Sequence, residues 1–330
     1  MSYFYHAVVD SDHFPRDRDG DSAQVAIMTV LGEVWRCDEG VLVPSAAIVD
    51  IVSRLGFSEV SVRGALSRMQ RKGTLVLHKV GRTTAYRLSE DVLESIPASE
   101  VLTMGFGVST RPWDGTWTVV VYSLTDAQRD RRQTLREWLR WLGFGPVRDG
   151  VWISPDADAD VTRKALSDLL PPDGLVLRSS IIAGEVMPDR VWSLDRVRDA
   201  YVSFIEEFRP SLFSLREGTV SPAEAFVLWN SILGRWRAFP STDPDLPNTA
   251  LPVDWPRLEA RRIFVTVHDE CVPLVENLIR GIVEPYSAEL ASHVRLLTVE
   301  ESLAVHSELS ARSDRPRALE AIDPALLPSA

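Results

Sequence analysis

Apolar residues recur at helical spacing soon after a polar N-terminal stretch. Residues 22–35 carry the first such pattern, with Ser22 in the position of an N-cap. A second stripe occupies residues 46–55, and Gly56 follows it where helices commonly stop. The apolar positions of the two stripes are Val25, Met28, Leu31, Val34, Ile48, Ile51, Val52 and Leu55. The pattern predicts two amphipathic helices.

A third helix and two strands follow at once. Residues 59–73 repeat the helical pattern behind a candidate N-cap, Ser58. Residues 74–80 and 84–90 then have the composition of two strands with a tight connection between them. Two helices joined by a short turn and followed by a hairpin are typical of a winged helix-turn-helix. We assign this domain to residues 21–96.

Glycine and proline interrupt the chain between residues 97 and 112, which predicts a linker. Beyond it, β-branched runs alternate with amphipathic segments. The strands are expected within residues 116–124, 150–155 and 174–182, and the helices within 125–143 and 159–170. Strands that alternate with helices over so short a length predict a small ferredoxin-like α/β sandwich over residues 113–190.

The remainder of the chain is predicted to be mainly helical over residues 191–310. A proline-rich connector, residues 241–256, separates two amphipathic segments from residues 257–283, which we expect to form one helix. Residues 1–20 have little to bury and are predicted to be disordered, and residues 311–330 are predicted to be a frayed tail. The fold class is therefore expected to be α+β, in three parts.

Composition narrows the class of protein. The chain has 330 residues, of which 45% are hydrophobic and 25% charged, as in soluble proteins of two or three domains. Two cysteines are too few for a disulfide framework. The N-terminus lacks the apolar core of a secretory signal, and no apolar run approaches the roughly 20 residues that span a bilayer. We expect a cytoplasmic protein that does not contact membranes.

Positive charge is concentrated in one segment of an acidic chain. The net charge is −11, yet residues 53–88 hold eight basic residues and one acidic residue, Glu59. That segment therefore carries +7 and the rest of the chain −18. A local basic surface on an acidic protein indicates one polyanionic partner, and the helix-turn-helix indicates double-stranded DNA. The alternatives are a solvated basic helix and a winged helix that binds only proteins.

In the DNA interpretation, the helix over residues 59–73 enters the major groove and the hairpin lies near the backbone or minor groove. Arg63 and Arg68 are best suited to bidentate contacts with guanine. Gly64 costs about 1 kcal/mol in mid-helix relative to alanine, and we interpret it as a place of close approach to another backbone. The candidate DNA-binding residues are Ser58, Ser61, Arg63, Gly64, Ser67, Arg68, Arg71, Lys72, Lys79, Arg82, Thr83 and Arg87.

Five stretches of the chain resemble the phenylacetic-acid-degradation repressor (PaaX) family of transcriptional regulators. They are "LGFSEVSVRGALSRMQRKGTL", "GRTTAYRLS", "WDGTWTVVVYSL", "LRWLGFGPVRDGVWISP" and "WRAFPSTDPDLPNTALPVDWP", in the family's order. The resemblance implies a winged helix, a ferredoxin-like middle and a helical C-terminal region. It also implies a homodimer that represses transcription and leaves DNA when a small effector binds. In the best-known branch the effector is an aromatic acyl-CoA, phenylacetyl-CoA.

Tryptophans and arginines of the middle and C-terminal parts are candidates for holding such an effector. Tryptophans are suited to an aromatic or acyl group and arginines to the phosphates of coenzyme A. The alternative is that the tryptophans belong to the hydrophobic core or to a dimer interface. The candidates are Trp117, Arg131, Trp138, Arg148, Trp152, Arg178 and Trp236. The linker over residues 97–112 is the candidate hinge.

An enzyme is the main competing class. The central region also resembles small ferredoxin-like CRISPR-associated nucleases, which place a metal-binding aspartate directly after the tyrosine that ends the first strand. Here Ser123 follows Tyr122, and a serine lacks the charge that a hard cation needs. Asp126 comes three residues later, where we expect a helix cap. No metalloprotease or paired-cysteine motif is present, so we predict no catalytic residue, metal or cofactor.

Overall fold

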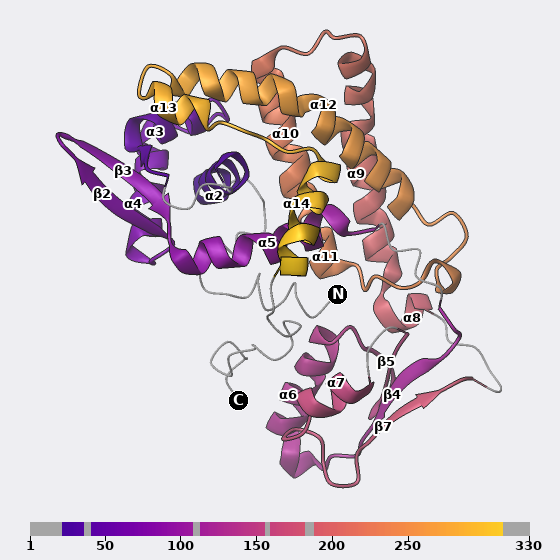
Figure 1. Ribbon diagram of the computed structural model, residues 1–330. Helices are drawn as coiled ribbons and strands as arrows, with labels where there is room; N and C mark the ends of the chain where they lie inside the picture. The colour runs from indigo at the N-terminus through magenta and orange to yellow at the C-terminus, as the bar shows by residue number, and fades with distance from the viewer. Residues whose placement is uncertain (1–21, 36–40, 108–112, 156–158, 182–187, 313–330) are drawn as a thin grey trace.

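The computed structural model describes residues 22–35, 41–107, 113–155, 159–181 and 188–312 (Figure 1). The predictions for residues 1–20 and for residues 313–330 therefore lie outside the described residues. Three units follow one another along the chain, and we call them the N-terminal unit (22–107), the central unit (113–181) and the helical unit (188–312). The chain is α+β, with two small antiparallel sheets and a helical C-terminal region.

The N-terminal unit contains the predicted elements in the predicted order. They are α2 (Ala23–Val34), α3 (Ser45–Ser53), α4 (Glu59–Arg71), β2 (Leu75–Val80) and β3 (Thr83–Leu88), and a short strand, β1 (Val43–Pro44), precedes α3. β1, β3 and β2 form an antiparallel sheet in that order. Most apolar positions of the three helices are buried against one another, as their spacing predicts, whereas Val25 and Leu55 are half-buried.

The predicted linker is wrong for residues 97–105, because they belong to α5 (Glu90–Gly105), a helix that contains Pro97. Contacts with the helical unit hold the end of this helix. The indole nitrogen of Trp236 donates to the Thr103 carbonyl at 2.9 Å. The Arg261 guanidinium donates to the Met104 carbonyl at 2.8 Å. These side-chain donors satisfy carbonyls that a helix end leaves without intrahelical partners, and the local sequence gives no sign of them.

The central unit is a four-stranded antiparallel sheet in the order β5-β6-β4-β7, with helices on one face. Its elements are β4 (Trp117–Val121), η1 (Asp126–Gln128), α6 (Arg129–Trp141), β5 (Gly145–Arg148), β6 (Val151–Ser154), α7 (Ala159–Ala165) and β7 (Leu175–Ser179). Figure 1 shows α6 and α7 together on one side of the strands. The βαββαβ order agrees with the predicted ferredoxin-like sandwich.

Strand β5 is absent from the sequence prediction, which assigned these residues to the connection before the second strand. Gly145 pairs with Ile153 of β6. A β-carbon at Gly145 would overlap the side chains of Val191 and Trp192, so the glycine lets α8 (Pro188–Trp192) pack closely on the strand. The glycine and proline that hide this strand in the sequence thus have a tertiary cause.

The helical unit continues from α8 with α9 (Leu194–Arg216), α10 (Pro222–Trp236), α11 (Phe239–Thr242), η2 (Asn248–Ala250), α12 (Arg257–Val283), α13 (Ala288–Ser292) and α14 (Val299–Arg312). Residues 257–283 form one helix, as predicted. The connector before it is organised by Arg257, whose side chain is 2% exposed. Its guanidinium donates to Asp245 at 2.9 Å and to the Leu246 carbonyl at 2.8 Å.

Two separate hydrophobic cores fill these units. One is continuous from α2 through α5 to α9, α10 and α12, so the N-terminal and helical units share it. The other lies between the sheet of the central unit and its helices. Within the described ranges, no helix is long and apolar enough to cross a membrane.

Candidate nucleic-acid interface

Helix α4 presents a polar face because its apolar face is fully used. Val62, Leu66 and Met69 are buried under the helix. The Ser58 hydroxyl accepts from the Ser61 amide at 3.2 Å and caps the N-terminus. Gly73, with φ of +79°, ends the helix in the left-handed conformation that favours glycine. Burial on one side therefore fixes which residues face outward.

The outward residues of α4 include most of the predicted base-reading set. Ser61, Arg63, Ser67 and Arg68 are exposed. Arg63 forms an ion pair with Glu59 at 3.4 Å, and both side chains are more than half exposed. Such a surface pair contributes little, so a phosphate or base can displace it. Five other exposed basic residues of α4 and the hairpin form no ion pair with any described residue; they are Arg68, Arg71, Lys72, Lys79 and Arg82.

The neighbour of Gly64 within the protein is a side chain of its own helix. A β-carbon there would lie 3.3 Å from the Nη1 atom of Arg68, and no backbone of another described segment lies within 4 Å of it. The glycine therefore gives the Arg68 guanidinium room against its own helix. Because that guanidinium is the end of a flexible side chain, a methyl group at residue 64 requires only a small displacement.

The β2–β3 hairpin projects from the molecule beside α4 (Figure 1). Lys79, Arg82 and Thr83 are exposed at its tip. Gly81 has φ of +61°, and the Thr83 hydroxyl donates to the Val80 carbonyl at 2.8 Å. The turn is thus built by local contacts that leave both cations free to face an external anion.

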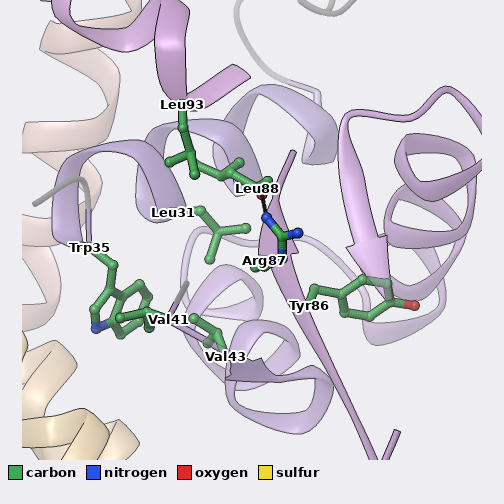
Figure 2. A pocket seen from close by; sticks show the side chains of 8 residues that line it. All are labelled: Leu31, Trp35, Val41, Val43, Tyr86, Arg87, Leu88 and Leu93. Carbon is green, nitrogen blue, oxygen red and sulfur yellow. Dashed lines mark hydrogen bonds between the residues drawn. The ribbon is translucent and has the colours of Figure 1, made fainter. Parts of the chain in front are cut away.

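Arg87 differs from the other wing candidates. Its Nε donates to the Nε2 atom of His78 at 3.2 Å, and its guanidinium also bonds the Leu88 carbonyl and pairs with Glu90. Figure 2 shows this side chain directed toward Leu88, beside a cavity of about 20 Å³. A cavity of that size admits about one water molecule. Arg87 therefore ties the base of the hairpin to α5 and lies away from the exposed tip.

The candidate effector residues do not form one pocket. Trp138 and Trp152 are buried in the core of the central unit, whereas Trp236 is buried in the core that the other two units share. Trp117 is covered by Trp113 and Trp192, with ring centroids at 4.7 and 6.1 Å. The alternative interpretation, that these tryptophans are core residues, fits their burial.

The three candidate arginines also lie apart. Arg131 donates to the carbonyls of residues 168, 169 and 170, so it clamps the end of the segment after α7. Arg178 pairs with Asp114 at 2.8 Å. Hydrogen bonds from Thr116, followed by that from Arg178, lower the pKa of the Asp114 carboxyl to about 2. Arg148 is exposed on β5.

Sequence reasoning missed a groove between the N-terminal and helical units. Its volume is about 520 Å³, and it lies where the end of α3 meets α9 and α10. The lining residues are Arg54, Glu207, Phe208, Ala223, Glu224, Val227, Leu228 and Ser231. These residues come from three distant segments, and nothing in their local patterns brings them together.

Residues that the nuclease alternative requires do not converge. Ser123 is exposed at the end of β4, while the Tyr122 hydroxyl accepts from the indole nitrogen of Trp152 at 3.2 Å. Across the described segments, no group of three or more histidine, cysteine, aspartate or glutamate residues is arranged to hold a metal ion.

The comparisons with known proteins agree on one protein family. The fold and the basic N-terminal surface define a three-part α+β protein with a Cas2-like middle. Three family models match the chain: "PaaX-like protein" over residues 22–92, "PaaX protein central Cas2-like domain" over 110–179 and "PaaX-like protein C-terminal domain" over 192–280. The chain belongs to the PaaX family.

Two relatives illustrate this likeness. "Transcriptional repressor PaaX" of Escherichia coli (strain K12) is 25% identical over 251 residues, which are 73% of this chain and 75% of that protein. The structure of "Uncharacterized protein Rv0674 from Mycobacterium tuberculosis" matches 79% of this chain and 98% of its own, with a TM-score of 0.55 and 22% identity. The second likeness concerns the fold alone. Family membership supports a role in transcriptional repression and favours a regulator over an enzyme.

Proposed function

We propose that this protein is a sequence-specific DNA-binding repressor and that its N-terminal unit is the winged helix that reads the operator. The observation that carries the proposal is the exposed set of cations on α4 and the hairpin tip, on a chain that is otherwise strongly acidic. Helix α4 lies in the major groove, and the hairpin follows the adjacent backbone.

Arg68 is the base-reading residue in this proposal. Its guanidinium is exposed and carries no ion pair with a described residue, so it reaches a guanine without breaking a bond of the protein. Lys79 and Arg82 contact phosphates. These contacts release counterions, so binding should weaken steeply as salt rises.

The test begins with selection of duplexes from a random pool by the purified protein. Arg68→Ala should then cost about 1–3 kcal/mol on the selected duplex and relax the preference at one base position. Arg216→Ala, which removes an exposed arginine at the end of α9, is the matched control. If the wild type selects no sequence, the result would favour the alternative of a winged helix that binds only proteins. Cleavage of the duplexes in Mg²⁺ would favour the nuclease alternative.

The repressor should act as a homodimer, and we propose that a second copy covers the open face of the central sheet. Val119, Val121, Val151, Leu175 and Leu177 point to the face opposite α6 and α7, as the strand register requires. Leu175 and Leu177 are 51% and 43% exposed. The patch is apolar, and none of its five side chains is charged.

A second copy fits this patch because two-fold symmetry brings the same apolar face to itself. The resulting dimer would hold two copies of α4, which must lie about 34–36 Å apart, or a multiple, to read two half-sites. Leu177→Asp should convert the dimer to a monomer in sedimentation velocity. Val253→Asp, at an exposed apolar residue of the helical unit, should leave the dimer intact.

We propose that the releasing effector binds the groove between α3, α9 and α10. Its volume falls in the range of small-molecule sites, and Phe208, Val227 and Leu228 give it an apolar floor. The groove reaches Arg54 at the end of the first helix of the helix-turn-helix. An aromatic acyl group seated there changes the contact between the two units. Val227→Asp should abolish release by an active acyl-CoA or aromatic acid while operator affinity is retained.

A further inference from the structure

Helix α6 of the central unit carries a stripe of four arginines that none of these roles uses. Arg129, Arg132, Arg136 and Arg140 are spaced three, four and four residues apart, so they share one face of the helix. The stripe is roughly 16 Å long at the rise of an α-helix. The two acidic residues of α6, Asp130 and Glu137, fall on a neighbouring face.

Part of the stripe is held in place. Arg132 donates to the Leu124 carbonyl. The Arg140 guanidinium lies over the ring of Trp152, 5.6 Å from its centroid. Fixed arginines lose less conformational freedom when they bind an anion.

Three members of the stripe are not neutralised. Arg129, Arg136 and Arg140 form no ion pair with any residue of the described ranges. Arg129 and Arg140 are exposed and Arg136 is half-buried. Like the cations of α4, they stand on a chain whose net charge is −11. A row of uncompensated arginines attracts an extended anion.

The length of the stripe selects among anions. One phosphate group of a small molecule meets one or two arginines, whereas a nucleic-acid strand carries a charge about every 3.4 Å and can engage the whole row. Neither the groove nor the small cavity described above includes a residue of α6. A convex row of cations therefore suits a DNA backbone better than it suits a small ligand.

We propose that the arginine stripe of α6 binds backbone phosphates of DNA that flanks the operator. The inference rests on the proposed function, because it assigns a second contact to the same DNA. In Figure 1, α6 lies on the side of the central unit toward the winged-helix elements, and β7 lies on the opposite side. A dimer formed through the open sheet face would therefore leave the stripe exposed. The contacts add affinity without base preference.

The experiment compares two duplexes that share the selected operator, one limited to it and one extended by 20 base pairs on each side (roughly two helical turns). The triple variant Arg129→Gln, Arg136→Gln, Arg140→Gln is titrated against both at several salt concentrations. On the long duplex, the slope of log K against log salt should become shallower by about 0.9 for each phosphate that the variant no longer binds. On the short duplex, variant and wild type should agree.

The matched control is the double variant Arg163→Gln, Lys164→Gln, which changes two exposed residues of α7. It should leave the salt dependence unchanged on both duplexes. Because Arg140 packs on Trp152, the double variant Arg129→Gln, Arg136→Gln provides a second form that keeps this contact.

Equal slopes for triple variant and wild type on the long duplex would overturn the proposal that the stripe binds DNA. The proposed role of α4 in reading the operator would be unaffected. Failure of the wild type to bind either duplex would overturn both proposals. The proposal would also be rejected if the triple variant bound DNA normally and lost only the binding of acyl-CoA. The stripe would then bind a phosphorylated small molecule and not DNA.

Discussion

The two hydrophobic cores make an instructive contrast. The N-terminal and helical units share one continuous interior, although residues far apart in sequence contribute to it. The central unit, which lies between them in the chain, has an interior of its own. The elements of the N-terminal unit are therefore attached to the distant helices more firmly than to the unit that follows them.

Polar contacts reinforce the shared core. The Arg237 guanidinium, at the end of α10, donates to the Thr29 hydroxyl at 2.7 Å and to Glu33 of α2. Trp236 and Arg261 hold the end of α5 from the same side. By contrast, the polar clamp of the central unit, from Arg131 to the carbonyls after α7, is internal to that unit. The N-terminal and helical units should therefore unfold together, and the central unit should unfold separately from them.

The largest expected effect comes from emptying one core at a time. Trp236→Ala removes a fully buried ring that stacks on Phe264 at 4.6 Å, and should cost about 3–5 kcal/mol. Calorimetry should show that it lowers the unfolding temperature of the N-terminal and helical units together. Trp152→Ala should cost a similar amount but lower only the transition of the central unit. A common shift in both variants would contradict two independent cores.

A smaller effect tests the polar contact between units. Arg237→Ala removes a partner of Glu33, whose side chain is 3% exposed, and should destabilise the shared core by about 2 kcal/mol. Glu33 has another interaction, which limits the destabilisation. Chemical denaturation measures the change, and Arg235→Ala, an exposed neighbour on α10, is the control. Equal destabilisation by the two variants would show that Arg237 does not join the units.

Gly64→Ala tests whether the glycine of α4 serves the approach of DNA or only the placement of Arg68. The helix gains up to about 1 kcal/mol in propensity, because the new methyl group meets only the end of Arg68. The unfolding temperature should rise slightly. Operator affinity should fall if DNA approaches the helix at this glycine, and it should stay constant if the glycine serves only to seat Arg68.

The smallest perturbation uses Cys271, which is buried in the shared core. Burial raises the pKa of its thiol to about 12, so the reactive thiolate is scarce at pH 8. In a Cys37→Ser background, a thiol reagent should label the native protein only as fast as the shared core opens. Rapid labelling under native conditions would show that this core opens locally around α12.

The sequence predicts the elements whose pattern is local. The helices α2, α3 and α4 follow from apolar spacing, and the hairpin follows from two short strand patterns around Gly81. Strand β5 and the second half of α5 are missed because their causes are distant: Trp192 packs on Gly145, and Arg261 caps the end of α5.

Site prediction divides in the same way. Exposure of Arg63 and Arg68 follows from the buried stripe on the opposite side of one helix. The inward role of Arg87 depends on His78 across the hairpin, and the groove depends on three segments. The effector candidates were selected by residue type alone, which does not distinguish a core tryptophan from one that lines a pocket.

Arg257 has a consequence for exchanging parts between relatives. Its guanidinium lies within 3.5 Å of Asp243 and 2.9 Å of Asp245, and Asp243 also accepts from the Tyr201 hydroxyl at 2.6 Å. A chimera that takes the proline-rich connector from one parent and α12 from another inherits a cation or a carboxylate sealed away from water without its counterpart. Viable crossover points in this part of the gene should therefore fall outside residues 243–257, so that the connector and the first turn of α12 come from the same parent.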